Sequence, residues 1–413
     1  MKGSITMKGH FYKPNCKCPG KKTKKCSCGA TWSYIIDVGI NPNTGKRKQK
    51  KKGGFKTKTE AQEAAALLVA ELSQGTYVEE KNNTFEEYAK EWLSEYQATG
   101  TVKISTVRIR KKGIKLLLPY LAKLRISIIT AKQYQHALLD LHDKGYSNNT
   151  IVSAHQTGRM IFQRAIELKI IKNDPTSSAV IPKRQRTIED LETEKEIPKY
   201  MEKEELALFL QTAKEKGLDR DYAIFLTLAY TGMRVGELCA LKWSDIDFSE
   251  QTVSITKTYY NPNNNIKNYT LLTPKTKSSK RVIIVDKKVL DELEQLQAEQ
   301  KRIKMFFRKT YHDKNFVFSQ QGEENAGFPT YPKLVALRMT RLLKLAGLNT
   351  KLTPHSLRHT HTSLLAEARV SLEQIMQRLG HRSDETTKNI YLHVTKPKKK
   401  EASQKFAELM SSF

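Results

Sequence analysis

A segment in the middle of the chain limits how the rest can fold. Residues 176–198, TSSAVIPKRQRTIEDLETEKEIP, combine two prolines and mixed charge with little hydrophobic periodicity, which is typical of a linker. The full length of 413 residues also exceeds what one hydrophobic core usually spans. We therefore predict a multidomain chain with folded parts at residues 1–80, 84–175 and 199–413.

Positive charge is in large excess and is placed unevenly. Lys and Arg number 72 against 43 Asp and Glu, and residues 1–58 hold 16 of these cations with one acid, Asp37. This excess predicts a polyanionic partner, and nucleic acid fits better than an anionic membrane. No apolar run is long enough to span a membrane and no apolar signal sequence opens the chain, so we expect a cytoplasmic protein with no membrane partner.

Residues 1–80 carry the signals of a small basic β-sheet with one helix. TWSYIIDVGI and KRKQKKKGGF, on either side of NPNTG, predict two strands, and EAQEAAALLVAELSQG predicts a helix capped by Thr59. A two- or three-stranded ribbon fits the major groove of DNA. A solvated basic turn or a localisation tract is the alternative. The expected DNA-binding residues of this sheet are Lys46, Arg47, Lys48, Lys50 and Lys51.

Four of the five cysteines fall within thirteen residues. Cys16, Cys18, Cys26 and Cys28 form a C-x-C-x7-C-x-C pattern. In a reducing compartment clustered thiolates favour a metal over disulfides, and zinc is the metal that four thiolates prefer. We predict a structural zinc hairpin, with a reduced hairpin of incidental thiols as the alternative. Cys239 lies in an apolar helical context and is expected in the core.

Residues 84–175 predict an all-α domain of about four helices without strands. Thr84 and Glu87 form a capping-box pattern before an amphipathic run, and SNNTIVSAHQTGRMIFQRAIELKII predicts a second amphipathic helix. A basic helical face could lie along a phosphate backbone, with an ordinary solvated face as the alternative. Its members are Lys103, Arg108, Arg110, Lys111, Lys112 and Lys115.

The last part is predicted to be mainly helical, with TVSITKTYY and KRVIIVDKKV as two strands joined by a long polar loop. Four of its motifs can be taken together. They are TGMRVGEL with Arg234, LLTPKTKSSKRVIIV with Lys275, TPHSLRHTHTSLL with His355 and Arg358, and LGHRSDETTKNIYLHV with His381 and Tyr391. Each motif is weak alone. Together they supply donors for the non-bridging oxygens of one phosphodiester and a hydroxyl nucleophile, which are the parts needed for phosphoryl transfer through a covalent intermediate.

The histidines of TPHSLRHTHTSLL also allow a metal site. His355 and His359 are four residues apart, which is ligand spacing on a helix. A hydrolytic zinc helix needs a Glu directly after its first His, and Ser356 stands there instead. We therefore expect an anion-binding site rather than a metal, with His359 and His361 serving packing or the helix surface.

In order and spacing these motifs resemble those of the tyrosine recombinases, and the whole chain resembles a phage or integrative-conjugative-element integrase. The resemblance covers about residues 84–395, and the basic N-terminal sheet is similar to the arm-binding domain of integrases, although the cysteine hairpin departs from the simpler versions of that domain. The implied fold is a helical, SAM-like core-binding domain at 84–175 and a mixed α+β, mainly helical catalytic domain with a C-terminal tail at 199–413.

The resemblance also implies roles for single residues. Arg234 and Arg358 would hold the scissile phosphate, and Tyr391 would attack it to give a 3′-phosphotyrosine and a free 5′ hydroxyl. His355 and His381 would hydrogen-bond the phosphate, and His355 would assist proton transfer. Lys275 would protonate the leaving oxygen, with Lys277 and Lys280 as alternatives. No cofactor is needed for this chemistry.

The implied function is integration and excision of a mobile element by site-specific strand exchange. The implied partners are double-stranded DNA with core and arm sites, three further copies in a homotetramer, and an excisionase or a host DNA-bending factor. Two alternatives remain. A topoisomerase or resolvase would use the same chemistry on one duplex, and the extra basic domain argues against it. A non-catalytic DNA-binding regulator is disfavoured because all six positions hold chemically competent residues.

Overall fold

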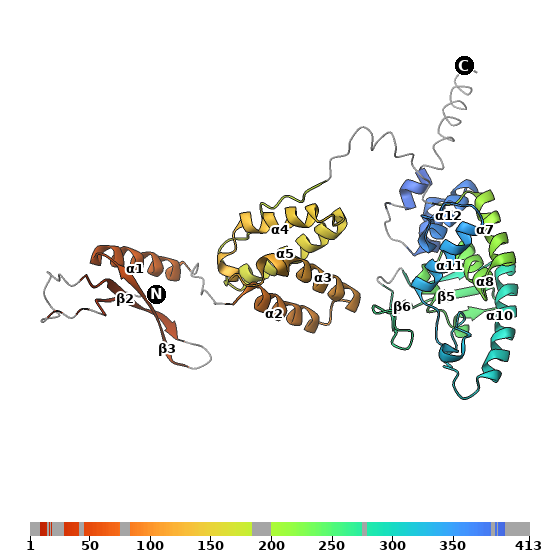
Figure 1. Ribbon diagram of the computed structural model, residues 1–413, viewed down its shortest axis with the longest axis horizontal. Coiled ribbons are helices and arrows are strands. Elements are labelled where there is room, and N and C mark those ends of the chain that lie inside the picture. The colour runs from red at the N-terminus through yellow and green to blue at the C-terminus, as the bar shows by residue number, and fades with distance from the viewer. Residues whose placement is uncertain are drawn as a thin grey trace, which may run out of the picture. The chain divides into compact units, whose positions relative to one another are not determined.

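A computed structural model describes residues 9–14, 16, 18, 29–40, 45–74, 83–183, 200–274, 279–380, 385 and 387–392. Contacts divide the chain into two compact units, Met1–Ile188 and Glu189–Phe413. The first unit contains a sheet with one helix and a bundle of helices, and the second is mainly helical (Figure 1). Among the helices that the structure describes, none combines the length and the hydropathy that crossing a bilayer requires.

The N-terminal sheet is antiparallel, in the order β1-β2-β3. Its strands are β1 (His10–Tyr12), β2 (Trp32–Ile40) and β3 (Arg47–Phe55), and α1 (Lys58–Ser73) lies along one face (Figure 1). Tyr34 and Ile36 of β2 are buried against Ala65 and Leu68 of α1. The predicted small sheet with one helix is confirmed.

The first helix begins earlier than predicted. Its N-cap is Thr57 and not Thr59, because Thr57 and Glu60 form a reciprocal capping box. The Glu60 carboxylate accepts hydrogen bonds from the backbone N–H groups of both Lys56 and Thr57, at 2.9 and 3.4 Å. Starting the helix two residues earlier therefore satisfies backbone donors directly after the end of β3.

The helical bundle of the first unit confirms the expected all-α domain. It consists of α2 (Phe85–Ala98), α3 (Ile104–Leu121), α4 (Ala131–Asp143) and α5 (Asn148–Glu167), with a short 3₁₀ turn, η1 (Ile126–Ile128). The predicted capping box at the start of α2 is present, since Glu87 accepts from the Thr84 N–H at 2.8 Å. The core is apolar and includes the fully buried Phe85, Leu117, Tyr134 and Phe162.

The second unit packs its helices around one apolar segment. α8 (Asp221–Thr231) is almost entirely buried and contacts α7 (Lys203–Lys216), α10 (Lys287–Phe306) and α12 (Pro354–Glu367). The other helices are α9 (Val235–Leu238), α11 (Pro332–Leu345) and α13 (Leu372–Leu379), with 3₁₀ turns η2 (Trp243–Asp245) and η4 (Glu323–Asn325). Residues 387–392 are also helical.

Two small antiparallel sheets complete this unit. β4 (Ile246–Asp247), β5 (Thr252–Ile255) and β8 (Arg281–Ile284) form one sheet in that order, and β6 (Thr258–Tyr260) pairs with β7 (Thr270–Leu272). The segment TVSITKTYY is therefore not one strand as predicted. It breaks before β6 because Lys257 turns to pair with the Asp245 carboxylate, so β5 and β6 belong to different sheets.

Candidate active site

Gly232 determines the backbone conformation of the segment that carries Arg234. α8 ends at Thr231, and Gly232 caps it with a left-handed conformation, φ +62°. A Cβ at this position would lie 2.6 Å from Cδ2 of His361, so both the backbone angle and the close packing require glycine. Arg234 then becomes the N-cap of α9, and its side chain is about one-third exposed. The predicted helix break after Gly232 is confirmed.

Arg358 connects two motifs that lie far apart in the sequence. Its residue is 2 % exposed, and its two terminal nitrogens donate to the carbonyl oxygens of Gly232 and Leu379, each at 2.7 Å. Gly232 lies two residues before Arg234, and Leu379 lies two residues before His381. A permanently charged, planar guanidinium is suited to holding two acceptors at once. The structure therefore fixes the start of the TGMR motif and the start of the LGHR motif to the same side chain.

Glu237 is a buried carboxylate shared by two arginines. Arg234 Nη1 lies 2.9 Å from its Oε1, and Arg281 Nη2 lies 2.9 Å from its Oε2. Burial alone would raise the pKa of Glu237, but the hydrogen bond and charge of Arg281, together with Arg234, lower the pKa below its usual value. Glu237 is therefore ionised and orients Arg234.

Sequence reasoning assigned no role to Arg281, which lies inside the motif LLTPKTKSSKRVIIV, or to Arg378, which directly precedes the motif LGHRSDETTKNIYLHV. Arg281 Nε donates to the carbonyl of Arg378 at 2.8 Å. The Arg378 guanidinium in turn donates to the carbonyls of Tyr230 and Ile284, both at 3.1 Å. Neither arginine had a sequence signal beyond its place in a motif or next to one, because its hydrogen-bond partners belong to other helices or strands.

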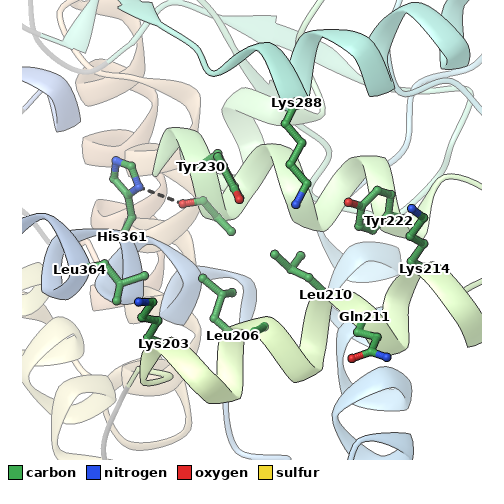
Figure 2. Close-up of a pocket in the computed structure, with 12 residues that line it drawn as sticks. Lys203, Leu206, Leu210, Gln211, Lys214, Tyr222, Tyr230, Lys288, His361 and Leu364 are labelled. Carbon is green, nitrogen blue, oxygen red and sulfur yellow. Dashed lines mark hydrogen bonds between the residues drawn. The ribbon is translucent and has the colours of Figure 1, made fainter.

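The three histidines of α12 have different surroundings. His355 is exposed in the first turn, and its ring lies edge-on to that of His359, with centroids 4.7 Å apart. His361 is buried, and its Nδ1 lies 2.9 Å from the Ala229 carbonyl (Figure 2). Its Nε2 lies 3.1 Å from Nε of Arg378, which can only donate, so Nε2 accepts and Nδ1 carries the proton. Packing is thus the role of His361, as the sequence predicted.

Burial dominates the charge state of His361. Desolvation, and next the charge of Arg378, lower the pKa of this ring to about 3. The ring is therefore neutral near pH 7 and supports Arg378 as an acceptor. Within the described residues no group of three or more His, Cys, Asp and Glu side chains is arranged to hold a metal ion.

His361 also forms part of the wall of a cavity between α7, α8, α10 and α12 (Figure 2). The cavity has a volume of about 610 Å³ and an apolar floor that includes Leu206, Leu210 and Leu364. Lys203, Lys214 and Lys288 lie around it. Lys288 also lies over the ring of Tyr230, 5.9 Å from the centroid, so this amine already has an aromatic partner.

Two of the six predicted catalytic residues, Lys275 and His381, lie outside the described residues, as does the alternative Lys277. Lys280 is described and exposed. Tyr391 is half-buried in the last described helical segment and packs against a small cluster formed by Ala366, Ile375 and Leu379. The cluster that Tyr391 packs against therefore includes Leu379, the residue whose carbonyl accepts from Arg358.

The five predicted DNA-binding cations of the N-terminal sheet do not share one face. Lys50 pairs with Ile36, which is buried against α1, so Lys50 belongs to the face that α1 covers. Lys51 pairs with Ile35 and belongs to the opposite face, where its amine lies 5.3 Å from the centroid of the Tyr12 ring. By the same alternation, Arg47 lies on the same face as Lys51 and forms an ion pair with Asp37. Lys48 lies on the same face as Lys50. Lys46 precedes the strand.

Of the four predicted zinc ligands, Cys16 and Cys18 are described and half-buried, in the connection between β1 and β2. Cys26 and Cys28 lie outside the described residues. Cys239 is buried, as predicted, and burial raises the pKa of its thiol.

A basic sheet, a helical bundle and a mainly helical unit with clustered arginines and a tyrosine define the class of the tyrosine-type DNA recombinases. Family comparisons agree along the chain. Residues 20–72 match the arm DNA-binding domain, residues 84–142 the N-terminal SAM-like domain of phage integrases, and residues 199–398 the phage integrase family. The chain belongs to the phage integrase family and is of the phage or integrative-conjugative-element type.

Relatives match over most of their length. The integrase of Staphylococcus phage L54a is 30% identical over 359 residues, covering 82% of this chain and 97% of the relative. The ICEBs1 integrase of Bacillus subtilis is 25% identical, with 91% and 97% covered. Among solved structures, the Tn1549 transposon integrase bound to transposon right-end DNA shares the fold, at 22% identity and a TM-score of 0.61, covering 78% of this chain and 99% of that one.

Proposed function

We propose that this protein integrates and excises a mobile element by site-specific strand exchange between two double-stranded DNA sites. The observation that carries the proposal is the pair of hydrogen bonds from Arg358 to Gly232 and Leu379, because they hold the segments leading to Arg234 and His381 against one buried side chain. Tyr391 packs against the small cluster that contains Leu379. These contacts support a single phosphate-binding site to which at least three of the four motifs contribute.

In the proposed reaction the Tyr391 hydroxyl oxygen attacks the scissile phosphorus, and the bond to the 5′ oxygen breaks. His355 assists removal of the tyrosine proton, and Lys275 supplies a proton to the leaving 5′ oxygen. Arg234, Arg358 and His381 neutralise and hydrogen-bond the phosphate oxygens as charge develops. The phosphodiester is conserved as a 3′-phosphotyrosine, so the reverse attack by a 5′ hydroxyl rejoins the strand without an external energy source.

We also propose a division of labour along the boundaries predicted from the sequence. We propose that residues 1–80 bind arm sites, that residues 84–175 and 199–413 grip the core site from the two ends of the linker at 176–198, and that four copies act on two duplexes. The tail would then pack on a neighbouring copy, and an excisionase or host DNA-bending factor would set the direction of the reaction. We propose that the protein acts in the cytoplasm, where its DNA substrate is found.

The N-terminal connection suits a structural zinc. Cys16 and Cys18 are half-buried, and thiolates are ligands that zinc prefers. We propose that they hold the ion together with Cys26 and Cys28. Bound zinc would supply a cross-link between the two ends of this connection, as a small basic sheet needs for stability.

A covalent trap tests the reaction. The protein is incubated with a duplex nicked near the cleavage site, so that the freed 5′-hydroxyl fragment dissociates and the adduct accumulates. We expect an SDS-stable protein–DNA adduct that disappears in Tyr391→Phe while binding of the duplex is retained. No adduct with the parent protein, or an adduct that survives Tyr391→Phe, contradicts the proposed function.

A further inference from the structure

Arg281 is one of the enclosed charged groups beside the candidate active site. Its side chain is 5 % exposed, although it belongs to β8 at the edge of a small sheet. All three guanidinium nitrogens are engaged. Nε donates to the Arg378 carbonyl at 2.8 Å, Nη1 to the Ser279 carbonyl at 3.2 Å, and Nη2 to the Glu237 carboxylate at 2.9 Å. A side chain held so fully has one defined position.

The position of Arg281 determines the net charge of the group around Glu237. Arg234 and Arg281 share the single carboxylate of Glu237, so the three side chains together carry one net positive charge. The Arg234 backbone N–H also donates to Oε2 of Glu237 at 3.0 Å, which fixes the carboxylate relative to the start of α9. If Arg281 were neutral, Glu237 and Arg234 would form a pair with no net charge.

The contacts of Arg281 also reach the second arginine of the site. The Arg378 carbonyl that Arg281 holds belongs to the residue directly before Leu379, whose own carbonyl accepts from Arg358. One guanidinium therefore braces both the carboxylate that orients Arg234 and the backbone that anchors Arg358. No neighbouring group in the described residues joins these two arginines in the same way.

We propose that Arg281 is a positioning residue for the strand-cleavage reaction, which offsets the charge of Glu237 so that Arg234 meets the scissile phosphate with its positive charge retained. It acts through Glu237 and does not touch the DNA. The inference rests on the proposed function, because the reaction it assists is the attack on a phosphodiester.

The test measures the rate of adduct formation in a single turnover on the nicked duplex, and separately the affinity for that duplex and the thermal unfolding midpoint. Arg281→Gln should slow adduct formation by roughly 10- to 100-fold, less than removal of a direct donor to the reacting group. Binding of the duplex should change little. Arg281→Lys keeps the charge and should be faster than Arg281→Gln.

A second substitution that restores the net charge of the group distinguishes the proposed role from a simple loss of folding. In Arg281→Gln combined with Glu237→Gln, one net positive charge returns to the group, so the double variant should form adduct faster than Arg281→Gln alone. Arg338→Gln is the matched control, because it breaks another ion pair in this unit, to the fully buried Asp221 at 3.0 Å, away from the four motifs. Arg338→Gln should lower the unfolding midpoint without reducing the rate of adduct formation.

Each outcome has one meaning. An Arg281→Gln protein that reacts as fast as the parent, a lysine variant no faster than the glutamine variant, or a double variant no faster than Arg281→Gln overturns the role of Arg281. A parent protein that forms no adduct at all instead overturns the proposed function. If Arg281→Gln does not fold, Arg281→Lys decides. Because it keeps the charge, it should form adduct at close to the parent rate. A rate reduced by more than about 100-fold, in a protein no less stable than Arg338→Gln, rejects the role.

Discussion

The guanidinium of Arg358 donates to the backbone carbonyl of Gly232 across 2.7 Å, although the two residues are 126 positions apart in the sequence. The bond joins the first turn after α8 to the middle of α12. Because the same guanidinium also holds the Leu379 carbonyl, the positions of three segments depend on one buried cation. A substitution that shifts one of these segments should therefore also change the positions of the other two.

Gly232→Ala should damage the site more than an ordinary glycine substitution. The left-handed φ of +62° costs an alanine about 1–2 kcal/mol, and the new Cβ would meet His361 at 2.6 Å. Gly347→Ala is the control, because its φ is +67° and nothing lies within 4 Å of the added Cβ. We expect a lower unfolding midpoint and slower adduct formation for Gly232→Ala than for Gly347→Ala. Equal behaviour of the two variants would argue against the close packing.

Stability should fall between pH 7 and pH 5 because of His361. Its pKa is about 3 in the folded protein against about 6.5 in an unfolded chain, so between these values the unfolded state binds one more proton. Stability from this group is complete above about pH 6.5 and is lost as the pH falls below it, by about 2 kcal/mol at pH 5. Chemical denaturation at both pH values measures the loss.

His361→Asn is the control for this pH dependence, since it cannot titrate. The pKa of His312, in the same unit, is also lowered, mainly by burial, and contributes equally to parent and variant. The difference between the two proteins therefore isolates His361. An unchanged pH dependence in His361→Asn would falsify the assignment of a neutral, buried ring.

Lys51 and Lys50 should differ in their effect on DNA binding. They are adjacent, but Lys51 belongs to the face of the sheet opposite α1 and Lys50 to the covered face. If the open face meets DNA, Lys51→Ala should reduce the slope of log affinity against log salt concentration by about 0.9, the loss of one phosphate contact. Lys50→Ala should leave the slope nearly unchanged. A salt titration with a duplex of mixed sequence measures both, and a larger effect of Lys50→Ala would point to the other face.

Metal analysis of the full chain tests the zinc proposal. We expect about one equivalent of zinc, lost in Cys16→Ser and retained in Cys239→Ala, whose thiol is buried in the second unit. A chelator should lower the unfolding midpoint of the parent protein and leave that of Cys16→Ser unchanged. A protein purified under reducing conditions without any bound zinc would rule the site out.

Local signals in the sequence were sufficient for much of the fold. The Thr84–Glu87 capping box depends only on residues three positions apart, and the structure contains it as predicted. Apolar spacing likewise gave the helical domain. The first helix was placed two residues late, because both Thr57 and Thr59 can cap it and only the contacts of Glu60 distinguish them.

The contacts that hold the candidate site in place could not be predicted from local sequence patterns. Arg281 meets Glu237 across 44 positions and the Arg378 carbonyl across 97, and no local pattern encodes either contact. The break between β5 and β6 has a similar origin, because it depends on Lys257 reaching Asp245 in the preceding turn. Chemistry identified the groups that could act on a phosphate, whereas the side chains that hold those groups depend on tertiary packing.

The alternation along β3 restricts how this part of the chain can diverge. Adding or deleting one residue in the strand would rotate every later side chain to the other side of the sheet, so Lys50 and Lys51 would trade environments and Phe55 would leave the core. If the sheet binds arm sites as proposed, lineages of this protein that come to bind other arm sequences should do so by exchanging amino acids at fixed length. Changes of length are expected between β2 and β3, where an extra residue leaves the alternation along β3 unchanged.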